Sequence, residues 1–452
     1  MLQNSVALLP APFLDATEAI MGRERFERFL GAFQEEPPVS VRLNPLKTNL
    51  QSPLFNLQSP VPWCADGRYL SQRPNFTFDP LFHAGCYYVQ EAASQFVTHC
   101  IRSLLKPTEA PPSAPEGATI VLREVRRGEP IEAPRGGRRG GLALDLCAAP
   151  GGKSTALRSV LPADWLLVSN EPVRKRAQIL SENMQKWGHP QCIVTNNYPR
   201  DFARSGLTAA FDVVLCDVPC SGEGMFRKDP AAIGEWSPQN VERCWQLQRQ
   251  IVADILPCLR PGGVLVYSTC TFNTKETEEN VKWLLETFDA DIVDIPTLPD
   301  WHIVGSLLPG FDMPVYRFIP GTTRSEGLFV AVVRKSGDDA PREGKKAKAV
   351  STALSRLNQM EQSACAEALS ADLDDTRHTV VNLDYDTAIA YLRREAIVLP
   401  SDTPRGIVVV AYQGHPLGVA KNIGSRVNNL YPREWAIKST YRPGGEGGVL
   451  KE

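Results

Sequence analysis

Several features that mark whole classes of protein are missing from this sequence. No uncharged apolar run reaches the roughly 18 to 20 residues of a membrane-spanning helix, and the N-terminus has neither a basic start nor a small-residue cleavage site. The 11 cysteines include no CxxC pair and no histidine partner at zinc-finger spacing, which disfavours a disulfide framework and a structural zinc site. We therefore expect a monomeric, cytoplasmic protein without a metal ion or a membrane partner.

An excess of positive charge is also missing. The chain has 49 Lys and Arg residues against 51 Asp and Glu residues, so a nucleic acid would have to meet a local basic patch. The stretches 123–139 and 334–348 are basic enough to be candidates, but either can equally be a solvated linker.

The chain of 452 residues is long enough for two to four domains at roughly 100 to 200 residues each. A helix is expected over Asp15–Phe33 and a strand over Val39–Asn44, within a small α+β module. Composition then divides the chain into that module at 1–105, a Pro/Gly/Arg-rich insertion or loop at 106–141, an α/β domain at 142–335, a charged linker at 336–349 and a β-rich C-terminal domain at 350–452.

The α/β domain is predicted from short apolar runs that alternate with helical stretches. These runs are LALDL, WLLVSNE, QCIVTNN, FDVVLCDVP and GGVLVYSTC. The pattern is typical of an open, mostly parallel sheet with helices on both faces. Ligands of such a sheet bind at the carboxyl ends of its strands.

A glycine-rich turn follows the first of these strands. Asp145–Ser154 reads DLCAAPGGKS and precedes a helical run, so bare backbone N–H groups at the helix start can bind an anionic ligand. Glu171 follows the second strand, where an acidic side chain commonly accepts hydrogen bonds from ribose hydroxyls. This predicts a nucleoside-bearing cofactor. The alternative is a simple tight turn with a solvated helix cap, and the missing GxGxxG spacing argues against an NAD-dependent dehydrogenase.

Two cysteines follow two further strands. Cys220 comes shortly after the strand that ends at Asp217, and Cys270 ends the strand that begins at Val264. Parallel strand ends open onto one crevice, so two thiols and a carboxylate should converge beside the cofactor turn. A single cysteine in such a place is usually core packing, and we read Cys147 and Cys216 in that way.

Cytosine methylation at carbon 5 needs this combination of groups. Carbon 5 is not nucleophilic by itself, so a thiolate must first add to carbon 6 while an acid donates to the ring nitrogen. Carbon 5 can then attack a methyl sulfonium, and a base removes its proton before the thiolate leaves.

The motifs resemble those of the Sun (NSUN) group of RNA 5-methylcytosine methyltransferases. LDLCAAPGGKS, FDVVLCDVPCSG and YSTCTFNTKETEENV are similar to its three active-site motifs, and SVRLNPLK and GCYYVQEAAS to its N-terminal module. PLGVAKNIGSRVNNLYPREW resembles the C-terminal domain of the RsmF type within that group. The resemblance implies a Rossmann-like class I methyltransferase sheet with a small N-terminal α+β RNA-binding module and a β-rich, PUA-like, RNA-binding C-terminal domain. Val213 departs from the pattern, since the family usually has Lys, Arg or Ala there.

The resemblance also implies residue roles. Cys270 would be the nucleophile, Cys220 would assist release of the product, and Asp217 would be the acid at the cytosine ring. S-adenosylmethionine would be bound by Cys147, Ala148, Ala149, Pro150, Gly151, Gly152, Lys153, Glu171, Asn197 and Asp217. Asn197 lies where the family often has an acid near the adenine, and Lys153 can equally be a structural residue at the helix start.

The implied substrate is RNA, with small-subunit (16S) ribosomal RNA or the small ribosomal subunit as the first expectation. A transfer RNA remains an alternative, and so does a non-catalytic ribosome assembly factor, although such a factor would be expected to have lost Cys270 or Asp217. A DNA cytosine methyltransferase would need only the Pro-Cys motif. In the C-terminal domain, cations and aromatic rings suited to RNA are Lys421, Arg426, Tyr431, Arg433 and Trp435, unless they are ordinary residues of a β-rich domain.

Overall fold

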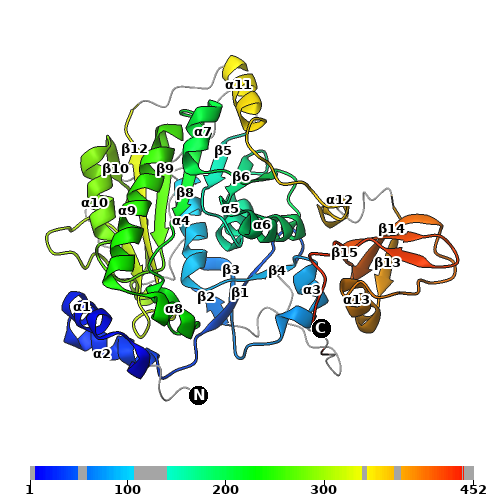
Figure 1. Cartoon of the computed structure of the whole chain (residues 1–452), viewed down its shortest axis with the longest axis horizontal. Helices are drawn as coiled ribbons and strands as arrows, with labels where there is room; N and C mark the ends of the chain where they lie inside the picture. Colours follow the sequence, from blue (N-terminus) through cyan, green and yellow to red (C-terminus); the bar gives the residue numbers. More distant parts are fainter. Residues whose placement is uncertain are drawn as a thin grey trace, which may run out of the picture.

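The computed structural model describes residues 6–48, 59–105, 140–337, 344–370, 378–439 and 441, and contains three sheets (Figure 1). Apart from residues 140 and 141, the predicted insertion at 106–141 lies outside the described residues. The same is true of residues 338–343 in the predicted charged linker. The borders between the predicted domains therefore stay predictions.

The N-terminal module begins with two helices rather than the one that we predicted over Asp15–Phe33. Helix α1 spans Ala11–Met21 and α2 spans Arg23–Ala32. Gly22 separates them with a φ of 72°, a left-handed conformation that a residue with a side chain rarely adopts, so the first helix ends there. A four-stranded antiparallel sheet follows in the order β2 (Ser59–Val61), β3 (Cys64–Leu70), β1 (Val39–Leu43), β4 (Tyr87–Val89), with α3 (Pro80–His83) and α4 (Phe96–Leu105).

The central sheet confirms the predicted Rossmann-like fold. Its strand order is β7 (Cys192–Thr195), β6 (Leu166–Asn170), β5 (Leu142–Asp145), β8 (Phe211–Asp217), β9 (Leu259–Thr269), β12 (Leu328–Lys335), β10 (Ala290–Ile292), and β11 (Tyr316–Phe318) also pairs with β12. The first five run parallel, whereas β12 runs antiparallel to β9. The order reverses between β5 and β8, which is the switch point where such sheets bind ligands.

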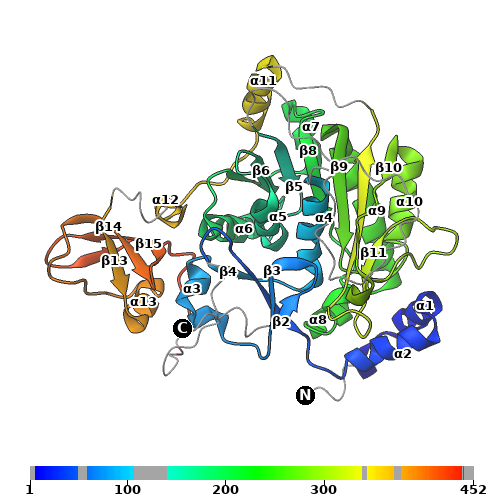
Figure 2. The same ribbon diagram turned by 180° about the vertical axis from the view of Figure 1, so that it is seen from behind.

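Helices cover both faces of this sheet, as Figures 1 and 2 show from opposite sides. Residues of β8 alternate between the two cores: Val213 and Leu215 face one, and Val214 and Cys216 face the other. The first core includes α4, α5 (Gly152–Val160) and α6 (Arg174–Trp187). The second includes α7 (Pro199–Ser205), α9 (Pro238–Ile255) and α10 (Glu278–Thr287), while the short α8 (Pro230–Glu235) packs against α1 and α2.

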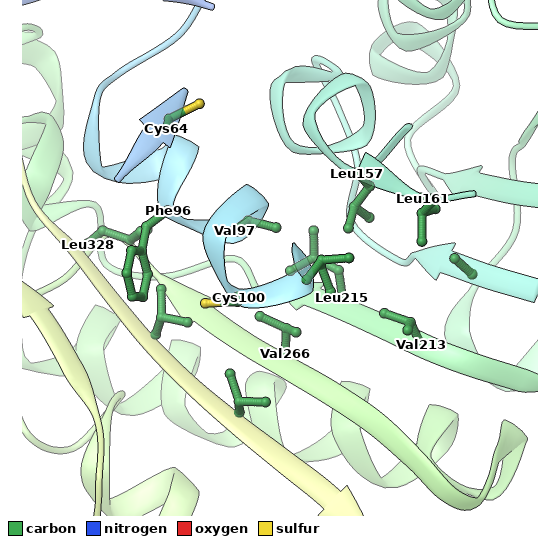
Figure 3. Packing of buried hydrophobic residues seen from close by; sticks show 14 of the residues in the cluster. Cys64, Phe96, Val97, Cys100, Leu157, Leu161, Val213, Leu215, Val266 and Leu328 are labelled. Atoms are coloured by element: carbon green, nitrogen blue, oxygen red, sulfur yellow. The ribbon is translucent and has the colours of Figure 1, made fainter. Parts of the chain in front are cut away.

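Helix α4 joins the N-terminal module to the central sheet. Figure 3 shows Phe96, Val97 and Cys100 of α4 over Val266 and Leu328 of the sheet. The Phe96 ring is fully buried, with its centroid 5.1 Å from that of Phe318 and 5.3 Å from that of Tyr316. One apolar core therefore continues across the predicted border between the two domains. Val213 belongs to the same core, where its aliphatic side chain is part of the packing.

The C-terminal part contains α11 (Gly344–Leu354), α12 (Ala366–Ser370), β13 (Val380–Leu383), α13 (Tyr385–Leu392), β14 (Gly406–Tyr412), β15 (His415–Asn422) and β16 (Val427–Asn429). Its strands form a separate sheet in the order β13-β14-β15-β16. Its core also includes Phe78 and Leu81 of the N-terminal module, and the Tyr385 hydroxyl donates to the Phe78 carbonyl at 3.0 Å. Among the described residues, no helix has the length and apolar character needed to cross a lipid bilayer.

The shared core at α4 generates a stability prediction. Phe96→Ala should lower the free energy of unfolding of the central sheet by about 3 kcal/mol, because it removes a fully buried ring and leaves a cavity. Leu46→Ala, at a largely exposed side chain, is the control and should change it by less than about 0.5 kcal/mol. Urea denaturation followed by circular dichroism measures both. An equal, small effect of the two substitutions would show that α4 does not contribute to the stability of the sheet.

Candidate active site

Two thiols meet where β8 and β9 end. Both strands run parallel with Asp217 paired to Ser268, so the loops that follow leave the sheet side by side. The Sγ atoms of Cys220 and Cys270 lie 3.2 Å apart. The backbone N–H of Gly224 donates to the Cys270 carbonyl at 2.7 Å and fixes one loop against the other. The structure thus brings together the two cysteines that the sequence singled out.

A carboxylate and an ammonium lie at the same strand end. Asp217 Oδ2 is 2.9 Å from Lys153 Nζ, and Ser268 donates to Asp217 Oδ1 at 2.8 Å. Lys153 is mostly buried at the start of α5. Burial is the largest single influence on its pKa and lowers it, but the charge and the hydrogen bond of Asp217, together with Cys270 and Asp145, more than offset burial, so the pKa is raised. Lys153 therefore carries a positive charge that is held in place by Asp217 and also interacts with Cys270.

Three thiols near the strand ends have raised pKa values, but not for the same reason. The pKa of Cys220 is raised well above its ordinary value, first by its hydrogen bond to Cys270 and then by burial. Burial also raises the pKa of Cys147 and of Cys216, whose side chains belong to or pack against the core. These two thiols stay protonated, in keeping with the structural role that we predicted for them.

The glycine-rich turn connects β5 to α5 at the switch point of the sheet. Gly151 has a φ of 118°, and the turn leads directly into the first turn of α5. Asp145 is fully buried; Ser154 donates to its Oδ2 at 2.7 Å, while its Oδ1 has no hydrogen-bond partner among the described residues. Burial raises the pKa of Asp145 to about 7. A buried carboxylate oxygen without a partner is unusual, and a ligand that binds at this turn would explain it.

The N-terminal module packs on this turn. Arg42 of β1 is fully buried and donates to Thr155 Oγ1 at 2.5 Å and to Ser159 Oγ at 3.0 Å, both on α5. A Cβ atom at Gly152 would lie 3.3 Å from the ring of Tyr88 in β4, which leaves no spare room. The module therefore forms part of the wall around the turn.

Glu171 lies at the end of β6, as predicted, and is almost fully buried. Its Oε1 accepts the backbone N–H of Val173 at 3.0 Å. Its Oε2 has no hydrogen bond among the described residues, and its nearest cation is Arg176 at 3.4 Å. Val173, two residues further along the chain, is half-exposed and adds an apolar surface near the Glu171 carboxylate.

The side chain of Asn197 binds a segment of the C-terminal part. Its side-chain amide donates to the backbone carbonyl of Asn358 at 3.1 Å, and its Oδ1 accepts the backbone N–H of Asn358 at 3.1 Å. Gln359 pairs with Thr195, so this segment continues the sheet beyond β7. Asn197 thus joins the sheet to the segment that leads to the C-terminal domain, and its contact with the cofactor stays a prediction.

The predicted RNA-binding residues fall into two groups. Lys421, Arg426 and Arg433 are exposed on the C-terminal domain. Tyr431 is 0% exposed and Trp435 is 6% exposed, and the Tyr431 ring packs against the rings of Tyr391 and Trp435 in the core of that domain. The prediction that these two rings stack on bases is wrong, because no base can reach them in this fold.

Sequence reasoning missed two buried acids. Glu223 and Glu276 each follow one of the two cysteine motifs and are almost wholly buried. Glu223 accepts the backbone N–H groups of Phe272 and Asn273 at 2.6 and 3.0 Å. In the sequence, Glu223 stands out as the charged residue among the small residues of 221–224, whereas Glu276 lies among the other charged residues of 275–279 and has no signal of its own.

Comparison with known families covers all three parts of the chain. The family described as 16S rRNA methyltransferase RsmB/F matches residues 135–334. The N-terminal domain of 16S rRNA methyltransferase RsmF matches residues 9–92, and the methyltransferase RsmF PUA domain matches residues 378–437. The predicted PUA-like C-terminal domain is thereby confirmed.

Curated relatives share this organisation. The ribosomal RNA small subunit methyltransferase F of Serratia proteamaculans is 29% identical over 96% of this chain and 98% of that protein. The protein of the same name from Pectobacterium atrosepticum is 31% identical over 75% of this chain and 66% of its own length.

Solved structures show the same fold. A methyltransferase homolog from Pyrococcus horikoshii has a TM-score of 0.55 at 24% identity and covers 74% of this chain and 98% of its own. A structure titled NSun6 from Pyrococcus horikoshii with SFG has a TM-score of 0.54 at 19% identity and covers 73% of this chain and 99% of its own. With its three matched domains in one order and relatives along almost its whole length, the chain belongs to the RsmB/F family of 16S rRNA methyltransferases.

Proposed function

We propose that this chain transfers a methyl group from S-adenosylmethionine to carbon 5 of a cytosine in small-subunit ribosomal RNA. The observation that carries the proposal is the 3.2 Å approach of Cys220 and Cys270 beside the Lys153–Asp217 ion pair. A nucleophilic thiol, a second thiol and a proton-donating pair are the groups that carbon 5 methylation requires.

The residues at the turn suit S-adenosylmethionine. Asp145 Oδ1 and Glu171 Oε2 accept no hydrogen bond among the described residues, although Glu171 Oε2 is in an ion pair with Arg176, and both can accept hydrogen bonds from an ammonium group and from ribose hydroxyls. The left-handed Gly151 and the crowded Gly152 leave the backbone bare at the start of α5, where a carboxylate is favoured. When bound, the cofactor supplies an electrophilic methyl group on a sulfonium centre.

Cys270 is the proposed nucleophile. Its thiolate adds to carbon 6 of the cytosine, and the negative charge that develops on the ring is neutralised at nitrogen 3. Since Lys153 holds Asp217 in an ion pair, we assign the ring contact to the pair: the carboxylate binds the amino edge of the base, and the ammonium supplies the proton. This refines the assignment of Asp217 alone as the acid.

Cys220 is the proposed base of the second step. In the free protein its hydrogen bond to Cys270 is the largest cause of its raised pKa. That cause disappears once Cys270 carries the base as a thioether, so Cys220 becomes easier to deprotonate when the carbon 5 proton must be removed. Loss of that proton expels Cys270 and releases the methylated cytosine.

Small-subunit ribosomal RNA is proposed as the substrate because relatives along almost the whole chain carry that name. A transfer RNA is the second candidate substrate. Measuring methyl transfer to each of the two RNAs separates the candidates. A non-catalytic assembly factor would have no need for the paired thiols.

The cofactor assignment predicts a loss of affinity in Glu171→Gln. Replacing the buried carboxylate, whose Oε2 accepts no hydrogen bond among the described residues, should weaken S-adenosylmethionine binding by about 1.5 to 3 kcal/mol, because a hydrogen bond to a charged group is lost. Calorimetry measures it, with Glu286→Gln, at an exposed residue of α10, as the control. Equal affinities in the two variants, or a preference for NAD, would contradict the placement of the cofactor.

The two thiols should fail at different steps. Cys270→Ala should abolish turnover and form no protein–RNA adduct. In Cys220→Ala, the Cys270 thiolate should still add to the base and the methyl group should still be transferred, but the adduct should accumulate. A denaturing gel, with and without nuclease, detects the adduct as a slowly migrating band. The reverse pattern would exchange the roles of the thiols. Unchanged turnover in both variants would make them packing residues.

The exposed cations of the C-terminal domain should contact phosphate groups. Changing Lys421, Arg426 and Arg433 together to Ala should weaken RNA binding and reduce its salt dependence by roughly one unit of log–log slope per lost contact. S-adenosylmethionine affinity should not change. Arg243→Ala with Lys282→Ala, at exposed positions of α9 and α10, is the control. An unchanged salt slope in the triple variant would make these residues ordinary surface charges.

A further inference from the structure

Glu223 binds the turn that carries the nucleophile. It lies in the loop after Cys220, yet its Oε2 accepts the Thr271 hydroxyl at 2.6 Å and the backbone N–H groups of Phe272 and Asn273. These three donors follow Cys270 directly. Its Oε1 accepts from Trp236 Nε1 at 3.0 Å and from Asn273 Nδ2 at 2.8 Å.

Glu276 makes the reciprocal contact. It lies in the loop after Cys270, yet its Oε2 accepts the backbone N–H of Ser221, the residue after Cys220, at 3.0 Å. Gln248 of α9 donates to the same oxygen at 2.7 Å. Asn273 Nδ2 lies between the two acids, 2.8 Å from Glu223 Oε1 and 2.9 Å from Glu276 Oε1. Each cysteine loop is therefore held by a carboxylate from the other.

Charge compensation does not explain these acids. Within the described part of the chain, no Lys or Arg forms a salt bridge with Glu223 or Glu276. Burial and the neighbouring Glu223 raise the pKa of Glu276 to about 7. Two buried carboxylates so close together cost stability, and such sites are concentrated where function needs them.

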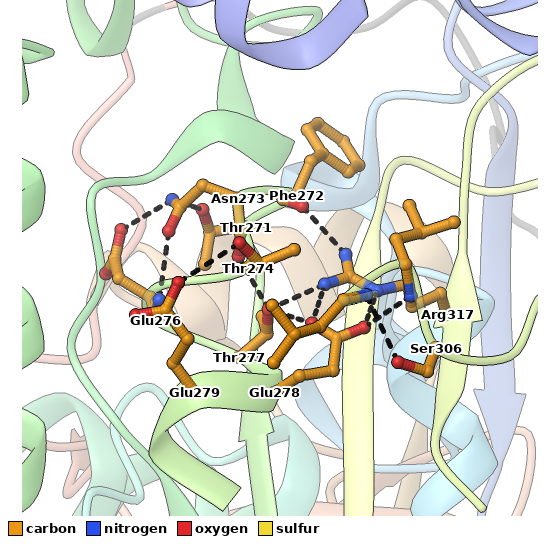
Figure 4. A network of polar contacts seen from close by, with 12 residues as sticks. Thr271, Phe272, Asn273, Thr274, Glu276, Thr277, Glu278, Glu279, Ser306 and Arg317 are labelled. Atoms are coloured by element: carbon orange, nitrogen blue, oxygen red, sulfur yellow. Dashed lines mark hydrogen bonds and ion pairs between the residues drawn. The ribbon is translucent and has the colours of Figure 1, made fainter. Parts of the chain in front are cut away.

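The far side of the turn is anchored separately. Figure 4 shows Arg317 beside Phe272, Thr277 and Glu278, and its Nη1 donates to the Phe272 carbonyl at 2.8 Å. The turn after Cys270 is therefore fixed to β11 on one side. On its other side, the two carboxylates and the Gly224 N–H bond fix it to the loop of Cys220, together with a 3.3 Å contact between the hydroxyls of Ser221 and Thr271.

We propose that Glu223 and Glu276 are positioning residues that hold the two cysteine loops in register, so that Cys270 and Cys220 reach the same cytosine in turn. The inference rests on the proposed function for its catalytic meaning. Both oxygens of each carboxylate accept hydrogen bonds, whereas a Gln offers one accepting oxygen. A Gln at position 223 would therefore lose either the backbone N–H bonds to Phe272 and Asn273 or the side-chain bonds that its other oxygen accepts, which should loosen the contact between the loops.

The closing experiment measures thiol geometry without any reaction on RNA. Phenylarsine oxide bridges two neighbouring thiols, with two sulfur–arsenic bonds formed and one water released. Peptide mapping by mass spectrometry should find the bridge between Cys220 and Cys270 in the unaltered protein and none in Cys220→Ala. In Glu223→Gln the bridge should form about tenfold more slowly, since a set of charge-assisted hydrogen bonds is lost.

Asp212→Asn is the matched control. Asp212 is also a buried carboxylate that accepts a backbone N–H, from Leu142 at 2.6 Å, but it lies at the start of β8, at the opposite end of the strand from the thiols. The Asp212→Asn variant should be less stable than the unaltered protein but should form the arsenic bridge between Cys220 and Cys270 at the same rate. If Glu223→Gln does not fold, Glu276→Gln provides the same test through Ser221.

Methylation assays add the catalytic readout. Glu223→Gln should lower kcat and accumulate the protein–RNA adduct, while S-adenosylmethionine affinity stays unchanged. A bridging rate equal to that of the unaltered protein in both Gln variants would overturn the positioning role, whatever the reaction is. If bridging is slow in these variants but the unaltered protein methylates no cytosine, the positioning role is supported and the proposed function is overturned.

Discussion

The parallel pairing of β8 with β9 is the constraint on which the active site depends. It places Asp217 against Ser268, so the carboxylate is oriented by a neighbouring strand and the two loops leave the sheet together. A shift of one residue would turn alternate side chains to the opposite face and carry Asp217 away from Lys153. The apolar residues on both faces of β8 fix this register, because each face is buried in its own core.

The flanking parts are built into the catalytic part rather than attached to it. Arg42 binds the helix that begins at the glycine-rich turn, and α4 completes one helical layer of the central sheet. The segment at Asn358 and Gln359 extends the same sheet at the other edge. A substrate held by the N-terminal module would therefore lie beside the glycine-rich turn, whose walls belong partly to that module.

Sequence patterns predicted the fold and the positions of the key thiols because both follow from local order: apolar runs, a glycine turn and residues at strand ends. The helix break at Gly22 was missed because the apolar spacing continues across it, and only the backbone angle reveals the interruption. Tyr431 and Trp435 were misassigned because a sequence does not distinguish an exposed ring from a core ring. Glu223 and Glu276 were missed because each accepts hydrogen bonds from the loop of the other cysteine. Glu223 and its partner Asn273, for example, are 50 residues apart in the sequence.

Tritium release tests the central claim most directly. RNA with tritium at carbon 5 of its cytosines is incubated with the protein and S-adenosylmethionine that carries a labelled methyl group, and both labels are counted. The proposed reaction replaces the carbon 5 hydrogen, so one tritium atom should enter water for every methyl group that enters small-subunit ribosomal RNA. Methyl transfer without loss of tritium would contradict the account, because the methyl group would then be at another atom.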